Sequence, residues 1–210
     1  MEFEEIIQKL ELKFKAALPG QAAHEIMMPV ESTRARFDLD RKDVKRGGVL
    51  ILIYKNGKEA FIPLTQRHDY GGTHGGQVSL PGGKLEEDDE NITATALRET
   101  YEEIGISPDN VTLIGELTDL YIPPSNFRVT PIVGYLHEQP KFSIDTFEVK
   151  ELIETPMKHL LDKSRRKRKD ITVRNGFRLN APYFDVHGKV VWGATAMILA
   201  EFTSLLSDED

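Results

Sequence analysis

The sequence contains no cysteine among its 210 residues, and this absence excludes several kinds of site. Disulfides, thiolate zinc sites, iron–sulfur clusters and a cysteine nucleophile all require the missing side chain. Any bound metal must therefore use oxygen or histidine nitrogen. The chain also lacks an apolar run approaching the roughly 18 residues that a transmembrane helix needs. Basic residues are too few to balance the acidic ones, since 27 Lys and Arg against 34 Asp and Glu give a net charge of −7. This balance disfavours proteins that bind nucleic acid over a broad basic surface.

The organisation predicted from composition is one domain over residues 1–210. Hydrophobic residues make up 40% and charged residues 29%, which is a globular balance that rules out disorder for most of the chain. We find no repeat and no linker. The start of the chain is acidic and amphipathic, whereas a secretory signal needs a basic start and an apolar stretch, so we expect a cytoplasmic location.

One local feature departs from the acidic average. Between Lys163 and Lys169, six of seven residues are Lys or Arg. Such a charge block is typical of a solvated loop. The alternative is a contact with phosphate, on a substrate or on a nucleic-acid partner such as RNA. The net negative charge makes nucleic acid the less favoured partner.

Apolar spacing predicts an α/β fold with a mixed sheet. The first helix, at about residues 2–18, has its apolar residues on one stripe, and it would pack on the domain. An apolar run at 48–54 and a second at 59–65 predict two strands joined by a hairpin turn at Asn56-Gly57. The other expected elements are helices at 88–104, 156–161 and 195–206 and strands at 111–117, 128–135, 171–173 and 183–191. Residues 21–46 show no clear period.

Acidic residues gather on the helix expected at 88–104. On a helical wheel, Glu99, Glu102 and Glu103 share an arc of about 100°, while Tyr101 and Ile104 fall on the opposite, apolar side. Like charges at this spacing destabilise a helix by about 0.2–0.5 kcal/mol per pair. They also lie near the helix C-terminus, where the dipole favours cations. A hard divalent cation, Mg²⁺ or Mn²⁺, would compensate them.

The spacing around these acids resembles the box of the Nudix hydrolases, Gly-x5-Glu-x7-Arg-Glu-U-x-Glu-Glu-x-Gly-U, where U is apolar. The match from Glu90 onward is in register, through Arg98-Glu99 and Glu102-Glu103 to Gly105-Ile106. Six residues separate Gly83 from Glu90 rather than five, and Thr100 fills an apolar slot.

The longer loop is similar to that of one branch, the coenzyme A pyrophosphatase-like Nudix proteins. Leu64-Thr-Gln-Arg67, His74-Gly-Gly-Gln-Val-Ser-Leu-Pro-Gly-Gly83 and Trp192-Gly-Ala-Thr-Ala196 also resemble that branch. The branch has arginine where Gly72 stands and phenylalanine where Leu80 stands.

The resemblance implies a Nudix-type α/β/α sandwich in which residues 81–106 form the catalytic loop and helix. It implies hydrolysis of a diphosphate bond with Mg²⁺ or Mn²⁺. The expected substrate is coenzyme A or a related nucleoside diphosphate derivative, and coenzyme A would give 4′-phosphopantetheine and 3′,5′-ADP. Alternatives are ADP-ribose, another nucleotide sugar or an altered nucleoside triphosphate. A module that binds nucleotide without hydrolysis is a further alternative, which the intact acids disfavour.

The resemblance also assigns roles to residues of the box. Metal ligands would be Glu99, Glu102, Glu103 and the Gly83 carbonyl, and either Glu102 or Glu103 would take the proton of the attacking water. Arg98 would pair with Glu90 and pin the loop to the helix, which is a structural role, as is that of Gly105.

Substrate contacts are expected from Arg67, Gln77 and His74, with Glu148 as an additional acid. Each has a simpler alternative. Arg67 would be a surface arginine, Gln77 a brace of the glycine-rich loop, His74 a locally bonded histidine and Glu148 an exposed loop residue. The expected partner is therefore a small nucleoside diphosphate molecule, without a membrane. A homodimer remains open.

Overall fold

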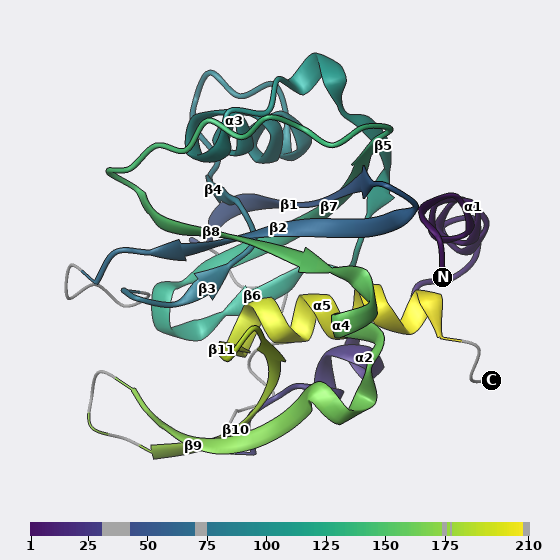
Figure 1. Cartoon of the computed structure of the whole chain (residues 1–210). Coiled ribbons are helices and arrows are strands. Elements are labelled where there is room, and N and C mark those ends of the chain that lie inside the picture. The colour runs from purple at the N-terminus through teal and green to yellow at the C-terminus, as the bar shows by residue number, and fades with distance from the viewer. Residues whose placement is uncertain (31–42, 70–74, 174–175, 177, 208–210) are drawn as a thin grey trace.

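The computed structural model describes residues 1–30, 43–69, 75–173, 176 and 178–207, and its centre is a mixed β-sheet (Figure 1). The sheet has the strand order β3-β2-β1-β7-β5, with β4 paired to β1, β6 to β7 and β8 to β2. Strands β1 and β7 run parallel, and the other pairs are antiparallel. The strands are β1 (Lys45–Asn56), β2 (Glu59–Arg67), β3 (Val78–Ser79), β4 (Gly82–Lys84), β5 (Thr112–Glu116), β6 (Leu120–Ile122), β7 (Phe127–Leu136) and β8 (Val149–Pro156).

Helices cover both faces of this sheet, and strand β1 shows why. Its apolar residues alternate, so that Leu50 and Leu52 contact the core under one face while Ile51 and Ile53 enter the core under the other. The helices are α1 (Phe3–Lys13), α2 (Gln21–Ile26), α3 (Ile92–Ile104), α4 (Met157–Leu161) and α5 (Gly193–Leu206), with 3₁₀ turns η2 (Pro108–Asn110), η3 (Pro123–Ser125) and η4 (Lys163–Arg165). Helix α3 lies on one face and α5 on the other (Figure 1). The predicted α/β class with a mixed sheet is confirmed.

A second, three-stranded antiparallel sheet lies beyond α5 (Figure 1). It has the order β11-β10-β9, with β9 at Arg166–Thr172, β10 at Arg178–Val186 and β11 at Lys189–Trp192. The basic run from Lys163 to Lys169 forms η4 and the first part of β9, so its interpretation as a loop is wrong. Its consecutive positive charges are compatible with a strand because β9 is an exposed edge that pairs only with β10 among the described strands.

Several sequence predictions need correction at the element level. Helix α1 ends at Lys13 rather than near residue 18, and α3 begins at Ile92 rather than 88. The first hairpin turns at Gly57-Lys58, because Asn56 already pairs with Glu59. Helix α2 and strand β8 were not predicted. Among the described residues, no helix combines the length and apolar character needed to cross a bilayer.

Candidate active site

The acidic helix α3 is fixed at both ends by local contacts. At its start the Asn91 side chain accepts a hydrogen bond from the backbone N–H of Ala94 at 2.9 Å. At its end Gly105 adopts φ +76° and donates its N–H to the Tyr101 carbonyl at 2.8 Å, which confirms the predicted stop. A Cβ at Gly105 would lie 2.6 Å from the Cβ of Ser143. The helix end thus lies close to the segment that leads from β7 into β8, and the Ser143 N–H donates to the Ile104 carbonyl at 3.0 Å.

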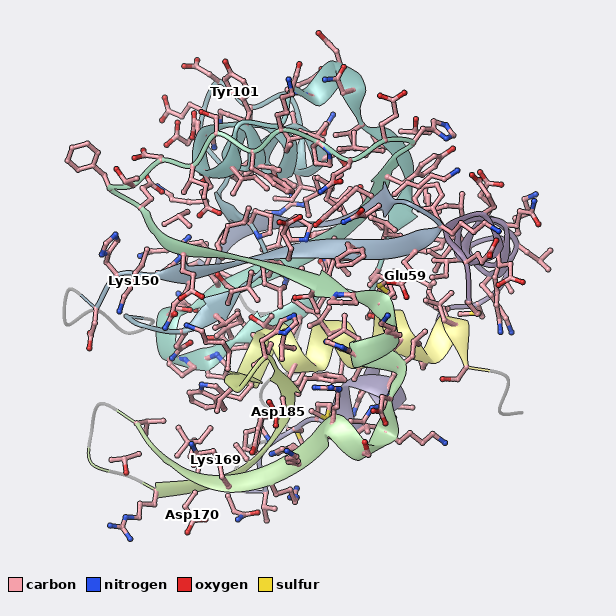
Figure 2. The ribbon with its side chains drawn as sticks, viewed as in Figure 1. Glu59, Tyr101, Lys150, Lys169, Asp170 and Asp185 are labelled. Atoms are coloured by element: carbon pink, nitrogen blue, oxygen red, sulfur yellow. The ribbon has the colours of Figure 1, made fainter. Side chains whose placement is uncertain are left out.

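The three carboxylates of α3 occupy three different environments. The side chain of Glu103 is 1% exposed, that of Glu99 is 15% exposed and that of Glu102 is 51% exposed. Tyr101, expected on the buried side, is exposed and lies on the outer side of α3 (Figure 2). The prediction that the three acids share one face opposite an apolar, buried face is therefore wrong. The buried face includes Thr100, whose hydroxyl is satisfied by the Ala96 carbonyl at 2.6 Å.

Glu103 reaches a polar niche beneath α3, between the ends of β2 and β4. The Arg67 Nη2 donates to Glu103 Oε1 at 3.0 Å and lies 3.3 Å from the Gly82 carbonyl oxygen. The Gly82 N–H points to Glu103 Oε2 at 3.4 Å. Three segments distant in the sequence thus meet at one carboxylate.

Burial dominates the electrostatics of the acids in this niche. Burial raises the pKa of Glu103 to about 7, although the Arg67 guanidinium and the Gly82 N–H oppose this rise. Burial also raises the pKa of Glu99, against the effect of Arg98. The negative charge of Glu148 raises the pKa of both groups further. Burial is therefore the main cause of both raised pKa values, and repulsion between the acids adds to it.

Glycine at position 83 makes room for Glu99, the partly buried acid. A Cβ at Gly83 would lie 2.3 Å from the carboxyl carbon of Glu99, closer than any real contact. Gly83 also pairs with Gly48 in the ladder between β4 and β1. The strand and the carboxylate can therefore approach each other only because no side chain intervenes. That the Gly83 carbonyl binds metal stays a prediction.

Arg98 pins the loop to the helix, but through a different acid from the one predicted. Its Nε and Nη2 donate to the two oxygens of Asp89 at 2.8 and 3.0 Å. Asp89 also accepts from the Thr95 hydroxyl, while Glu90 is exposed and makes no contact with Arg98. The predicted Glu90–Arg98 pair is wrong. The box places its first acid five intervening residues after the glycine and seven before the arginine. The first spacing, counted from Gly83, gives Asp89, whereas the second, counted back from Arg98, gives Glu90.

Arg98 also neutralises the acids of the helix itself. Its Nη1 lies 3.0 Å from Glu99 Oε1 and 2.9 Å from Glu102 Oε2. Its Nη2 donates to the Lys84 carbonyl at 3.1 Å. The guanidinium thus joins the acidic loop, strand β4 and helix α3, as expected of a structural residue of the box.

Of the other predicted site residues, some lie at or near the niche and one falls outside the described residues. Arg67 lies in the niche. The Gln77 carbonyl accepts the backbone N–H of Arg67 at 3.1 Å, which ties the glycine-rich segment to the end of β2. Glu148 lies exposed in the turn before β8, and its charge acts on Glu99 and Glu103. His74 and Gly72 fall outside the described residues.

The donor chemistry of the niche fits Mg²⁺ or Mn²⁺. The acids offer only carboxylate oxygens, and the glycine turn adds a close peptide carbonyl, which are ligands suited to hard cations. In the described part of the chain, no three acidic or histidine side chains form a ready-made metal cluster. Arg67 and Arg98 stand among the carboxylates instead.

Comparison with known proteins gives this geometry a context. Residues 44–171 match the family model described as NUDIX domain. The chain is 34% identical over 175 residues to "Nudix hydrolase 15, mitochondrial" of Arabidopsis thaliana, and the match covers 80% of this chain and 61% of that protein. It is 35% identical over 163 residues to an uncharacterized Nudix hydrolase, NudL, of Yersinia pestis, covering 78% of this chain and 80% of that protein. The chain thus spans about three fifths of the plant relative's length.

A solved structure supports the fold on its own. The NUDIX domain of Shewanella oneidensis NrtR, complexed with ADP ribose, superposes with a TM-score of 0.52 at 14% identity. The superposition covers 89% of this chain and 99% of that one. At this identity the likeness concerns the fold, and it confirms the predicted sandwich of helices around a mixed sheet.

Proposed function

This chain belongs to the Nudix hydrolase family, and from that premise we propose that it hydrolyses a diphosphate bond in coenzyme A or a related nucleoside diphosphate derivative, with Mg²⁺ or Mn²⁺. The water oxygen bonds to one phosphorus, the bridging P–O bond breaks, and the water's proton passes to the protein. From coenzyme A the products are 4′-phosphopantetheine and 3′,5′-ADP. The observation that carries the proposal is a pair of acids on α3, the partly buried Glu99 and the buried Glu103, which lie against Gly83 and Gly82 respectively.

We carry the residue roles over from the resemblance to the family. Glu99, Glu103 and the Gly83 carbonyl would hold the metal. Glu102, which is exposed and pairs with Arg98, would be a further ligand. When bound, the metal neutralises charge on the phosphate oxygens and on the leaving oxygen. Glu102 or Glu103 accepts the proton of water. Arg67 offers a planar guanidinium to the diphosphate.

Three observations bear on the substrate. The segments at 64–67, 74–83 and 192–196 resemble the coenzyme A pyrophosphatase-like branch, which supports coenzyme A. Gly72 stands where that branch has arginine, and the NrtR domain of similar fold is bound to ADP ribose. ADP-ribose, another nucleotide sugar or an altered nucleoside triphosphate is therefore the second candidate.

A substrate panel in ¹⁸O-labelled water tests the proposal. The protein would be incubated with coenzyme A, ADP-ribose, a nucleotide sugar and an oxidised nucleoside triphosphate, with Mg²⁺ or Mn²⁺. The masses of the products would be measured by mass spectrometry. We expect metal-dependent cleavage of coenzyme A with one labelled phosphate product, which also names the phosphorus attacked. Glu103→Gln should abolish it. Preferential cleavage of another diphosphate would support the second candidate, whereas tight binding without turnover would contradict both.

A further inference from the structure

Arg67 occupies an unusual position for a side chain expected to bind substrate. It lies at the end of β2, where the register between β2 and β8 shifts between Gln66 and Arg67. Its side chain is 41% exposed, yet its guanidinium pairs with Glu103, which is 1% exposed. A cation thus reaches from the edge of the site to its most buried carboxylate.

We infer that Arg67 is a stand-in cation that neutralises Glu103 in the metal-free protein and gives it up when a divalent metal binds. The inference rests on the proposed function, because it assigns Glu103 to the metal. A guanidinium and a divalent ion repel each other at neighbouring positions, so the two cations compete for one carboxylate. Competition of this kind is a coupling between two equilibria, and it lowers the affinity for metal.

The contacts of the two site arginines show which one can move. Arg98 is held by both oxygens of Asp89, by Glu99 and by Glu102, so it is anchored from both loop and helix. The side-chain contacts described for Arg67 are Glu103 and, at 3.3 Å, the Gly82 carbonyl. Its exposed side borders solvent. Released from Glu103, its planar fork is free for a diphosphate, which it can bind with two parallel hydrogen bonds.

This arrangement predicts effects of opposite sign for metal and substrate. Replacing Arg67 by a neutral residue should tighten metal binding, because the competitor is gone. The same replacement should raise KM for a diphosphate, because the guanidinium no longer contacts it. A purely structural arginine would weaken both, and a purely substrate-binding arginine would leave metal affinity unchanged.

The test is calorimetric titration with Mg²⁺ alone, without substrate, for the wild type, Arg67→Gln and Arg67→Met. The titration is made at about pH 9, where protons compete less for Glu103. We expect the Kd for Mg²⁺ to fall about tenfold in both variants, a change in proportion to removing one nearby positive charge. Arg67→Lys, which keeps the charge, should stay near the wild-type value.

Two controls separate this effect from general charge. Arg178→Gln removes one positive charge from an exposed position on β10, in the other sheet, and should leave the Kd unchanged. In a Glu103→Gln background, Arg67→Gln should no longer tighten binding. Melting curves with EDTA and with Mg²⁺ give a second readout, since a tighter site shows a larger rise in Tm on adding metal.

The outcomes are distinguishable. If the wild type binds Mg²⁺ and folded Arg67→Gln and Arg67→Met bind it equally or more weakly, the stand-in role is overturned while the proposed function survives. If the wild type binds no Mg²⁺ at the acids of α3, the proposed function itself fails.

Discussion

Asp89 is the residue that links the loop before α3 to the helix itself. It is 5% exposed and accepts hydrogen bonds from Arg98, the Thr95 hydroxyl and the Glu86 N–H. Asp89→Asn keeps the shape but removes the charge-assisted pair, so we expect a loss of about 1.5–3 kcal/mol in the free energy of unfolding, measured with urea. Activity should fall as well, because Arg98 also holds Glu99.

Glu90→Gln is the matched control, since Glu90 is exposed and lies next in the chain. It should change the unfolding free energy by less than about 0.5 kcal/mol. An equal loss in both variants would contradict the assignment of Asp89.

The contribution of Asp89 should also depend on pH. Hydrogen bonding from Arg98 holds the pKa of the Asp89 carboxyl far below its ordinary value. A group with a depressed pKa in the folded state stabilises the protein fully above the unfolded-state pKa, about 3.9, and loses this contribution as the pH falls toward the folded-state pKa. The difference between wild type and Asp89→Asn should therefore be constant near neutrality and shrink below about pH 4. A difference that grows on acidification would be inconsistent with this sign.

Gly83→Ala should separate activity from stability. The new Cβ would lie 2.3 Å from the Glu99 carboxyl carbon, so the flexible end of Glu99 must move away. We expect catalysis to fall about 100-fold, as for a ligand displaced by an ångström, with a loss of stability below about 1 kcal/mol. Gly188→Ala provides the opposite pattern, because Gly188 has φ +79° and open space around it. It should cost about 1–2 kcal/mol and leave activity intact.

At this scale the spacing of the box predicted that Glu99, Glu103 and Arg98 belong to one helix, but it did not predict the directions of their side chains. A helical wheel assumes that apolar residues face the core. In α3 the core accepts Thr100 and Glu103 because the Ala96 carbonyl and Arg67 satisfy them. Such partners come from tertiary structure and leave no trace in the periodicity.

Helix α3 as an element depends on its first turn. Asn91→Ala removes the acceptor for the Ala94 N–H and should cost about 1 kcal/mol in unfolding free energy. Asn91→Asp keeps the acceptor and should retain most of the stability. Hydrogen exchange of the first-turn amides of α3 would check that the loss is local, and uniform loss of protection across the sheet would argue against it.

Elements with a strong apolar pattern were predictable, and those built by pairing were not. The alternation in β1 and the glycine stop of α3 are properties of the local sequence. Strand β8, by contrast, carries charged residues along an exposed side, and it is a strand because it pairs with β2 from Phe61 to Arg67. The same holds for the basic β9, whose partner β10 lies on the side of α5 that faces away from α3 (Figure 1).

On the scale of the whole molecule, the helical layer opposite α3 is tied together by a buried polar network. Glu201 of α5 is fully buried and accepts the Thr118 hydroxyl at 2.6 Å and the Thr118 N–H at 3.2 Å. It also accepts the Gly20 N–H at 3.1 Å and lies 2.9 Å from Nε2 of His24, on α2. One carboxylate thus joins α2, α5 and the segment after β5, and the sequence did not reveal these contacts because the partners of Glu201 lie far from it along the chain.

Glu201→Gln should therefore cost stability without touching the chemistry. The amide NH₂ would face donors, leaving at least one buried donor unpaired, and the expected loss is about 1–3 kcal/mol in unfolding free energy. Glu25→Gln, an exposed change on α2, should be silent. Because α5 and α3 lie on opposite faces of the sheet, kcat and KM of the folded Glu201→Gln variant should match the wild type below its melting transition. A lower kcat with an unchanged melting temperature would mean that this layer is coupled to the acids of α3, which the packing gives no reason to expect.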